Sequence, residues 1–270
     1  MNSDFKKSRF ADYLRYLREI SLILTPPSRT ESGFYFNGNS QQKTGTYEIE
    51  IADYIKSNIS QFDLLINVGA NIGYWPCFAS SIRKLEIIAI EPDQFNYLRH
   101  RLNKFWNRFK KVKILNLACG IESGFIELYG FGTGISGVQG WAGGNSRRSK
   151  QVEQIRLDSL LSKIEVHSGR ILILIDAEGL EWDILNGCTG LMSLNPVFIV
   201  EISTTEHQPI SNSLNPHFFE TFDFMTANGF LVKTWINGKI VEVDRLLLLK
   251  IAQGEINFPT NHMFMFEAGY

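Results

Sequence analysis

This chain of 270 residues has few cysteines and a net charge close to zero, and each of these features argues against a class of protein. The three cysteines, Cys77, Cys119 and Cys188, match no metal-ligand spacing, so we expect reduced thiols in a cytoplasmic setting. A net charge of −1 argues against a general nucleic-acid binder. The longest apolar stretch, 246–252, is too short to cross a membrane, and the N-terminus lacks the apolar core of a secretory signal.

The remaining composition is that of a globular protein, with 44% hydrophobic and 20% charged residues. It supports one large α/β domain with a small extension. We place the extension at residues 1–46 and the domain at 47–270. Apolar residues at helical spacing between 10 and 24 predict a helix in the extension, ended by Pro26 and Pro27. We expect this helix to pack on the domain or a partner, with a membrane-surface helix as the alternative.

The chain is organised around residues 64–73, Leu-Leu-Ile-Asn-Val-Gly-Ala-Asn-Ile-Gly. The apolar run 64–68 predicts a buried parallel strand. Gly69, Asn71 and Gly73 predict a sharp turn, because glycine and asparagine tolerate positive φ. The following nine residues predict a helix whose free amides face the turn. A strand, a glycine turn and a helix together form a nucleotide-binding unit.

A second predicted strand, 86–90, ends at Glu91, about twenty residues beyond the glycines, where an acid accepts hydrogen bonds from ribose hydroxyls. Dinucleotide enzymes and methyltransferases share that device. The turn reads Gly-x-Asn-x-Gly rather than Gly-x-Gly-x-x-Gly, which favours S-adenosylmethionine over NAD, because a pyrophosphate needs more glycine-exposed amides. The third predicted strand, 112–117, leads to Ala118, whose backbone we expect beside an adenine edge.

Two segments beyond Glu91 have competing interpretations. Residues 93–108 predict a helix capped by Asp93, with an apolar stripe that we expect to be core rather than a base-stacking surface. The stripe consists of Phe95, Leu98, Leu102, Phe105 and Trp106. The glycine-rich segment 130–150 is either a lid, latched over a ligand by Trp141, or a solvated loop.

Two further apolar runs, 171–175 and 197–200, predict strands that end in Asp176 and Glu201. Because parallel strands meet at one edge of a sheet, we expect these acids to converge on the ligand crevice. There they would bind a divalent ion such as Mg²⁺, orient a hydroxyl or accept its proton, and these alternatives stay open. The competing interpretation is that both acids cap the turns that follow. His207 is a further candidate base.

Taken in order and spacing, these motifs resemble the FkbM-type methyltransferases. The matching stretches are Asn-Val-Gly-Ala-Asn-Ile-Gly (67–73), Glu91-Pro92, Leu157-Asp158 and Ile-Asp-Ala-Glu-Gly-Leu-Glu (175–181), with Tyr47-Glu48 upstream. The resemblance covers residues from about 45 to about 235. It implies a class I methyltransferase fold, S-adenosylmethionine as donor, and an oxygen acceptor on a sugar or natural product.

The resemblance also assigns site residues. The donor site then comprises Glu48, Asn67, Gly69, Ala70, Asn71, Gly73, Glu91, Pro92 and Ala118. Asp176 and Glu201 face the acceptor, with or without a metal. Asn67 stands where the family usually has Asp, which removes a charge near the methionine end of the donor, and Leu174 stands where it usually has Lys.

We therefore expect a doubly wound, Rossmann-like α/β domain of about seven mostly parallel strands with helices on both faces. Asn237-Gly238 predicts a hairpin near its end. The expected function is S-adenosylmethionine-dependent methyl transfer to a small-molecule or glycan hydroxyl, without stable membrane insertion. The alternatives are a nicotinamide-dependent oxidoreductase and a non-catalytic domain of this fold. The sequence leaves the oligomeric state open.

Overall fold

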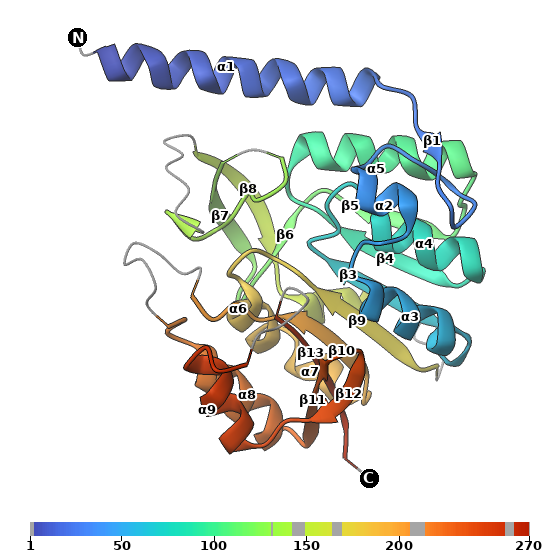
Figure 1. The fold of residues 1–270 in the computed structure, drawn as a ribbon, viewed down its shortest axis with the longest axis vertical. Helices are drawn as coiled ribbons and strands as arrows, with labels where there is room; N and C mark the ends of the chain where they lie inside the picture. Colours follow the sequence, from blue (N-terminus) through green and yellow to red (C-terminus); the bar gives the residue numbers. More distant parts are fainter. Residues whose placement is uncertain are drawn as a thin grey trace.

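The computed structural model describes residues 3–130, 132–141, 149–163, 169–205, 214–256 and 262–269, and is built on one central sheet (Figure 1). The strands of this sheet are β3 (Leu64–Val68), β4 (Glu86–Ile90), β5 (Val112–Leu115), β9 (Ile171–Ile175), β10 (Val197–Glu201), β11 (Phe230–Ile236), β12 (Lys239–Glu242) and β13 (Met263–Ala268). Their spatial order is β12-β11-β13-β10-β9-β3-β4-β5. The predicted doubly wound α/β architecture is confirmed.

The strand directions place the carboxyl ends of five neighbouring strands at one edge. β5, β4, β3, β9 and β10 pair in parallel, whereas β13 runs antiparallel between β10 and β11. The predicted hairpin at Asn237-Gly238 joins β11 to β12, which raises the strand number from the expected seven to eight. Ligands of such sheets bind beyond the carboxyl ends of the parallel strands.

The central strands are mostly apolar because helices cover both sheet faces, and Asn67 in β3 is a buried polar exception. Every residue of β3 and β9 is buried. Ile66 and Ile173 pack into the core on one face, and Leu65 and Leu172 into the core on the other. Each fully buried side chain of this size contributes about 1.5–3 kcal/mol relative to an exposed one. The continuous apolar runs in the sequence follow from this two-sided burial.

The remaining elements surround this sheet. The helices are α1 (Ser3–Leu24), α2 (Ser40–Thr44), α3 (Ile49–Asn58), α4 (Tyr74–Ile82), α5 (Gln94–Asn107), α6 (Glu181–Asn186), α7 (Thr189–Met192), α8 (Phe218–Ala227) and α9 (Arg245–Ala252), with 3-10 turns η1 (Ile59–Gln61) and η3 (Leu157–Lys163). Two small sheets pair β1 (Ser28–Arg29) with β2 (Tyr35–Phe36), and β8 (Ser149–Ile155) with β6 (Ala118–Cys119) and β7 (Gly124–Tyr129). Within the described residues, no helix combines the length and apolar character that crossing a membrane requires.

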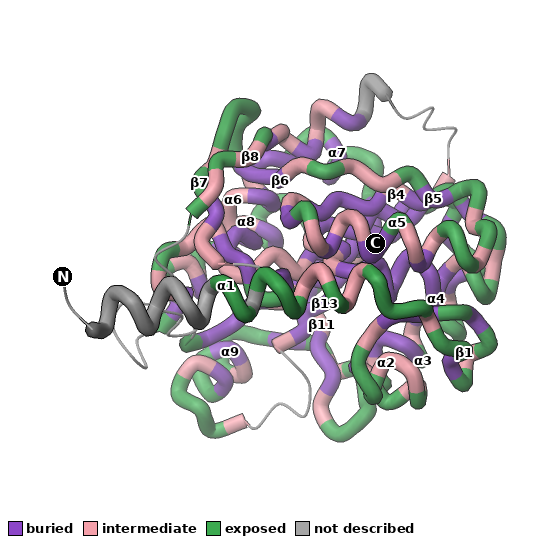
Figure 2. Tube along the Cα trace, turned by 90° about the horizontal axis from the view of Figure 1, so that it is seen from above, coloured by how far each residue is buried: buried purple, intermediate pink, exposed green. Residues whose placement is uncertain are grey.

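Helix α1 packs against α5 but leaves its predicted apolar face in solvent (Figure 2). Leu14, Leu17 and Leu24 are all exposed, Leu24 at 76% of its surface. Contact with α5 instead runs through Tyr16, whose ring meets Phe95 edge-on at 5.4 Å between centroids. The expected packing of this helix on the domain is confirmed, but Leu14, Leu17 and Leu24 of its apolar stripe stay exposed.

The apolar stripe predicted as core on α5 is also wrong at its C-terminal end. Phe105 and Trp106 are 75% and 48% exposed. The helix turns a polar face inward, because its partner there is backbone rather than a hydrophobic surface. Asn103 accepts a hydrogen bond from the amide of Asn37 (2.8 Å) and donates one to the carbonyl of Ile72 (2.9 Å).

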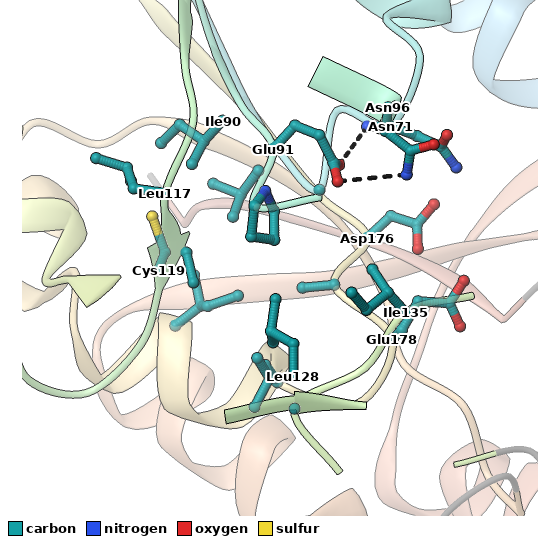
Figure 3. Close-up of a pocket in the computed structure, with 18 of the residues that line it drawn as sticks. Asn71, Ile90, Glu91, Asn96, Leu117, Cys119, Leu128, Ile135, Asp176 and Glu178 are labelled. Atoms are coloured by element: carbon teal, nitrogen blue, oxygen red, sulfur yellow. Dashed lines mark hydrogen bonds between the residues drawn. The ribbon is translucent and has the colours of Figure 1, made fainter. Parts of the chain in front are cut away.

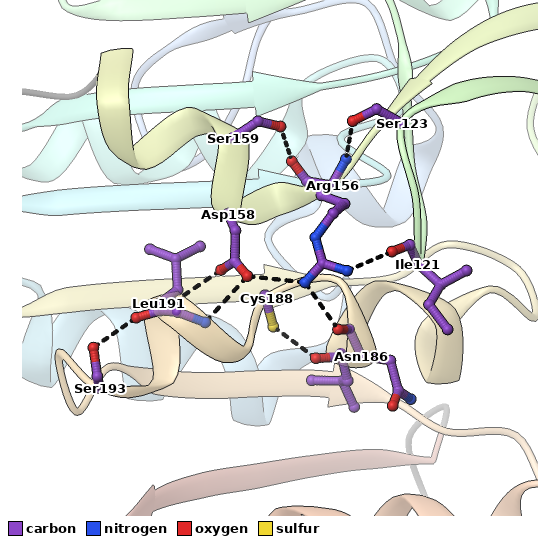
Figure 4. Close-up of polar contacts among 11 residues, drawn as sticks. Ile121, Ser123, Arg156, Asp158, Ser159, Asn186, Cys188, Leu191 and Ser193 are labelled. Atoms are coloured by element: carbon purple, nitrogen blue, oxygen red, sulfur yellow. Dashed lines mark hydrogen bonds and ion pairs between the residues drawn. The ribbon is translucent and has the colours of Figure 1, made fainter.

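Asp158 caps α7 rather than the 3-10 turn η3 in which it lies. Its carboxylate accepts hydrogen bonds from the amides of Gly190 (3.1 Å) and Leu191 (3.0 Å), at the start of α7 (Figure 4). Arg156 reaches the same carboxylate at 3.1 Å. The Leu157-Asp158 motif therefore ties η3 to α7 instead of capping η3.

Candidate active site

The glycine turn after β3 has the positive φ angles that its sequence predicts. Gly69, Asn71 and Gly73 have φ of 73°, 49° and 87°. A Cβ on Gly69 would lie 1.6 Å from the carbonyl oxygen of Asp176, and one on Gly73 would lie 2.0 Å from the His100 ring. Glycine at these positions therefore allows the ends of β3 and β9 to touch, and α5 to pack against the start of α4.

Glu91 holds the same turn from the end of β4. One carboxylate oxygen accepts a hydrogen bond from the amide of Asn71 at 2.8 Å, and the other accepts from the amide of Asp93 at 2.8 Å and from Asn96 at 3.3 Å (Figure 3). Burial raises the pKa of Glu91 to about 7, against these hydrogen bonds. Glu91 thus shapes the turn as well as facing the pocket beside it.

A pocket of about 550 Å³ lies beyond the strand ends, and it collects six of the predicted site residues (Figure 3). They are Gly69, Asn71, Glu91, Pro92, Ala118 and Asp176. Apolar side chains form much of the remaining wall, namely Ile90, Leu117, Leu128, Ile135 and Leu180. Three carboxyl groups, those of Glu91, Asp176 and Glu178, line the pocket, and its described lining includes no Lys, Arg or His. The carboxyl groups suit a cationic ligand, and the apolar wall suits a planar, apolar part of that ligand.

The other predicted site residues lie behind or beside this pocket. The amide of Ala70 donates to the carbonyl of Ile90 at 2.9 Å, and Gly73 starts α4. Asn67 and Glu48 are 1% and 7% exposed. Each of these two side chains has one buried oxygen without a hydrogen-bond partner, and such an atom costs about 1–3 kcal/mol unless a ligand satisfies it.

The structure brings Asp176 and Glu201 together at the ends of β9 and β10, as the parallel strands lead one to expect. Their carboxyl groups hydrogen-bond each other, which requires a proton between them. Burial raises the pKa of both acids, and the hydrogen bond raises the pKa of Glu201 further while opposing the shift at Asp176. We infer that the pair shares one proton, held by Glu201, with Asp176 as the accepting carboxylate.

Tyr47 and Glu48 complete this acidic corner. Their side chains hydrogen-bond each other, and the charge of Asp176 acts on both. Burial, and then Asp176, raise the pKa of Glu48 to about 8, while burial, and then Glu48, raise the pKa of Tyr47 above its usual range. Glu48 has φ of 42°, an unusual angle for a residue with a side chain. Two residues adjacent in sequence thus face acids more than a hundred positions away.

The described residues include no group of three or more His, Cys, Asp or Glu side chains that could hold a metal ion. The Mg²⁺ site expected at Asp176 and Glu201 is therefore not supported. Neither acid caps the turn after β9. That role belongs to Glu181, whose carboxylate accepts hydrogen bonds from the amides of Ala177 (3.0 Å) and Gly179 (3.1 Å). His207, the other candidate base, lies outside the described residues.

Part of the glycine-rich segment covers the pocket. Trp141 is 7% exposed, and its indole Nε1–H donates to the Glu178 carboxylate at 2.6 Å. The hydroxyl of Ser136 donates to the carbonyl of Glu178 at 2.5 Å. Ile135, which lines the pocket, comes from this segment and was not predicted, since the segment has no hydrophobic period. Whether the segment acts as a lid stays a prediction.

A second, polar cleft of about 1820 Å³ adjoins the pocket and shares Asn71 and Gly134 with it. Tyr47 lines this cleft, so the cleft extends to the corner that holds Asp176. Its other lining side chains come from α1, α5 and the segments beside them, and they include Arg18, Glu19, Asn39, Gln42, Arg99, Tyr129, Thr133, Ser136 and Trp141. Amides, charged groups and aromatic rings in one cleft are the groups that bind a polar, hydroxyl-bearing molecule.

Comparison with known proteins supplies a family. The sequence profile of the methyltransferase FkbM domain matches residues 67–232, more than half of the chain. A search of curated proteins found no match.

Solved structures of similar fold include a precorrin-6y C5,15-methyltransferase from Geobacter metallireducens, at 10% identity and a TM-score of 0.42, covering 81% of this chain and 88% of that one. A SAM-dependent methyltransferase from Agrobacterium tumefaciens is 9% identical with a TM-score of 0.42, covering 90% and 69%. An rRNA methylase from Streptococcus thermophilus is 6% identical with a TM-score of 0.44, covering 82% and 95%. At these values the likenesses say nothing about the reaction of this chain.

Proposed function

The chain belongs to the FkbM methyltransferase family, and from that premise we propose that it methylates a hydroxyl group of a sugar or natural product. It is an S-adenosylmethionine-dependent methyltransferase, so the donor needs a site in this fold. The observation that carries the proposal is the joint placement of the glycine turn, Glu91 and the Asp176–Glu201 pair around adjoining cavities.

The residues that line the first pocket suit this donor chemically. The turn at Gly69 and Asn71 would lie along the donor, Glu91 would accept from ribose hydroxyls, and Ala118 and the apolar wall would border the adenine. A sulfonium is cationic, and the pocket offers carboxyl groups without a neighbouring Lys or Arg in its described lining. The unpartnered oxygens of Glu48 and Asn67 would accept from the ammonium group at the methionine end.

The chemistry asked of the protein is positioning and proton removal. The donor, when bound, supplies an already activated methyl group. The chain's own residues then have to hold the acceptor oxygen in line with it and take its proton. We assign the proton to Asp176, because Glu201 keeps its own proton and leaves the Asp176 carboxylate as the acceptor of the pair. Tyr47, which lines the polar cleft, would orient the acceptor.

The polar cleft supports a hydroxyl-rich acceptor. Aromatic rings such as Tyr129 and Trp141 offer faces for a sugar ring, and Asn39 and Gln42 offer hydrogen-bonding amides. The same site fits the nicotinamide alternative poorly, because a pyrophosphate would have to lie among carboxyl groups. The proposal includes a reducing, cytoplasmic setting, which the three unpaired and buried cysteines support.

Calorimetry tests the donor half of the proposal. S-adenosylmethionine and S-adenosylhomocysteine should bind in a one-to-one ratio, and NAD should give no heat. The acceptor half is tested by incubating the protein with labelled donor and panels of nucleotide sugars, free glycans and phenolic hydroxyl compounds. Binding of NAD in preference to S-adenosylhomocysteine would overturn the donor assignment, and transfer to amines alone would overturn the acceptor class.

A further inference from the structure

The longest acid-free stretch near the site lies on α5 and the residues after it. Residues 94–121 contain seven Lys and Arg and no Asp or Glu. The rest of the chain carries 20 basic and 28 acidic residues, so positive charge is concentrated in this one segment. The net charge of −1 is a sum over the whole chain, so it does not reveal this local excess of positive charge.

The folded segment presents four of these cations beside exposed aromatic rings. We define the α5 basic surface by its residues: Arg101, Lys104, Phe105, Trp106, Arg108 and Lys110. The ring of Phe105 is 75% exposed and that of Trp106 is 48% exposed, so neither is needed to fill the core. Trp106 is backed by Tyr35, with ring centroids 6.3 Å apart, and Asn107 holds the backbone of Tyr35 by two hydrogen bonds.

A groove of about 1050 Å³ runs beside these rings, between α5 and the strand β5 at the edge of the central sheet. Its wall combines the cations of the α5 basic surface with the apolar side chains of Tyr97, Phe109 and Ile114. None of these residues lines the pocket or the cleft assigned to donor and acceptor. Cations flanking an apolar groove, with aromatic rings at its rim, suit an amphiphile whose head is anionic.

We propose that the α5 basic surface docks the protein on an anionic lipid bilayer. Lys and Arg side chains would contact lipid phosphates, while Phe105 and Trp106 would enter the interface between headgroups and acyl chains. A bilayer is flat and meets one face of the protein only. A polyanion that wraps around the protein would also meet the rest of the chain, in which acids outnumber cations. The docking is peripheral and needs no membrane-spanning helix.

The exposed face of α1 supports the same assignment. This helix packs against α5, and both lie at the same end of the molecule in Figure 1. Tyr13, Leu14 and Leu17 expose 54%, 49% and 42% of their surfaces. Exposed apolar side chains on a helix that packs against α5 are consistent with a protein that meets a lipid interface.

Vesicle sedimentation tests the proposal with the full chain. The protein should sediment with vesicles of phosphatidylcholine containing about 30% phosphatidylglycerol, remain in solution with pure phosphatidylcholine, and be released by salt. The double substitution Arg101→Glu and Lys110→Glu should weaken binding at least about tenfold. Phe105→Ala, at a side chain too exposed to affect folding, should weaken binding without removing its salt dependence.

The matched control is Lys239→Glu with Lys250→Glu, which changes the net charge equally at exposed positions on β12 and α9. β12 forms the opposite edge of the sheet from β5, so this variant should bind like the wild type. Equal loss in both double variants would show a net-charge effect and overturn the proposal. Failure to bind anionic vesicles would also overturn the proposal. Tighter binding of a single-stranded RNA than of vesicles at the same ionic strength would overturn it as well, if the Arg101 and Lys110 variant loses that RNA binding.

Discussion

Two carboxyl groups that share one proton divide the roles between them. The pKa of Glu201 is raised by burial and by the negative charges of Asp176 and Glu181. Asp176 receives its hydrogen bond and keeps the negative charge that a general base needs. Substituting Asp176 by Asn and substituting Glu201 by Gln should therefore have different effects on catalysis.

We expect Asp176→Asn to bind S-adenosylhomocysteine within about threefold of the wild type and to lose at least about 100-fold in kcat, since general-base catalysis contributes about 10²–10⁴-fold. Glu201→Gln is the matched control. It keeps a hydrogen-bond donor toward Asp176 and should lose much less activity. The measurement is single-turnover methyl transfer to an identified acceptor. Near wild-type transfer by Asp176→Asn would remove Asp176 from the role of base.

Glu91 carries a structural and a binding role at once, so its substitution should affect both. Glu91→Ala leaves the buried amides of Asn71 and Asp93 without their carboxylate acceptor. We expect a loss of about 1.5–3 kcal/mol in the free energy of unfolding, and weaker binding of S-adenosylhomocysteine. The stability change appears in urea denaturation and the binding change in calorimetry. A folded variant with unchanged affinity would show that Glu91 holds the turn without contacting the donor.

At the scale of elements, the segment before β8 is joined to the turn after β9 through Trp141. The indole lies against Gly179, where a Cβ would approach the ring to 2.7 Å, and donates to Glu178. Trp141→Ala should raise the dissociation constant of S-adenosylhomocysteine about tenfold, because the wall formed by residues 132–141 loses its anchor. Trp141→Phe, which keeps the ring and loses the indole donor, should have a smaller effect.

Limited proteolysis then tests the predicted lid. Donor should protect the wild type from cleavage between residues 130 and 150, and protection should be weaker in Trp141→Ala. Equal cleavage of the wild type with and without donor and acceptor analogue would return this segment to a surface loop.

The contact between η3 and α7 gives a prediction about stability alone. Asp158→Ala removes the carboxylate that caps α7 and should cost about 1–2 kcal/mol in the free energy of unfolding, as measured by urea denaturation. Asp158→Asn keeps an accepting oxygen and should cost less. Donor affinity should not change in either variant, because Asp158 does not line the pocket. A loss of affinity with no loss of stability would contradict this structural role.

Which elements could be predicted from the sequence depends on what each one packs against. β3, β4 and β9 match the runs 64–68, 86–90 and 171–175, because a strand buried on both faces needs mostly apolar residues. The convergence of Asp176 and Glu201 also followed, since parallel strands end at one edge. The periodicity rule failed on α5, because that helix packs on loop backbone, and a polar face satisfies backbone groups better than an apolar one.

Long-range pairings in the site had weaker signals. The contact between Trp141 and Glu178 joins a segment without periodicity to a distant turn, and nothing local encodes it. The corner formed by Tyr47, Glu48 and Asp176 was indicated only by the family motif. The α5 basic surface had a signal that composition concealed, namely an acid-free run of 28 residues in a nearly neutral chain.

At the scale of the whole molecule, buried acids with raised pKa values make stability depend on pH in an unusual direction. The pKa is about 8 for Glu48, about 8 for Glu181 and about 7 for Glu91, against 4.5 for an ordinary Glu, and burial is the largest cause in each case. Between pH 4.5 and these values the folded state binds more protons than the unfolded state. Stability from these groups is therefore full below pH 4.5 and is lost as pH rises toward 8.

We predict that the free energy of unfolding of the ligand-free protein falls by a few kcal/mol, on the order of one pKa shift, between about pH 5 and about pH 8. Urea denaturation across that range measures it. Glu48→Gln removes one titrating group and should flatten the profile. Glu242→Gln, at an exposed position on β12, is the control and should leave the profile as in the wild type. The cationic donor should reverse the trend, because ionised carboxyl groups bind a sulfonium better than protonated ones do. S-adenosylmethionine should then stabilise the protein more at about pH 8 than at about pH 6, and its advantage over the uncharged sulfur of S-adenosylhomocysteine should grow with pH. A stability that rises from about pH 5 to about pH 8 without ligand would show that these acids are ionised in the folded protein and would remove the electrostatic basis for sulfonium binding.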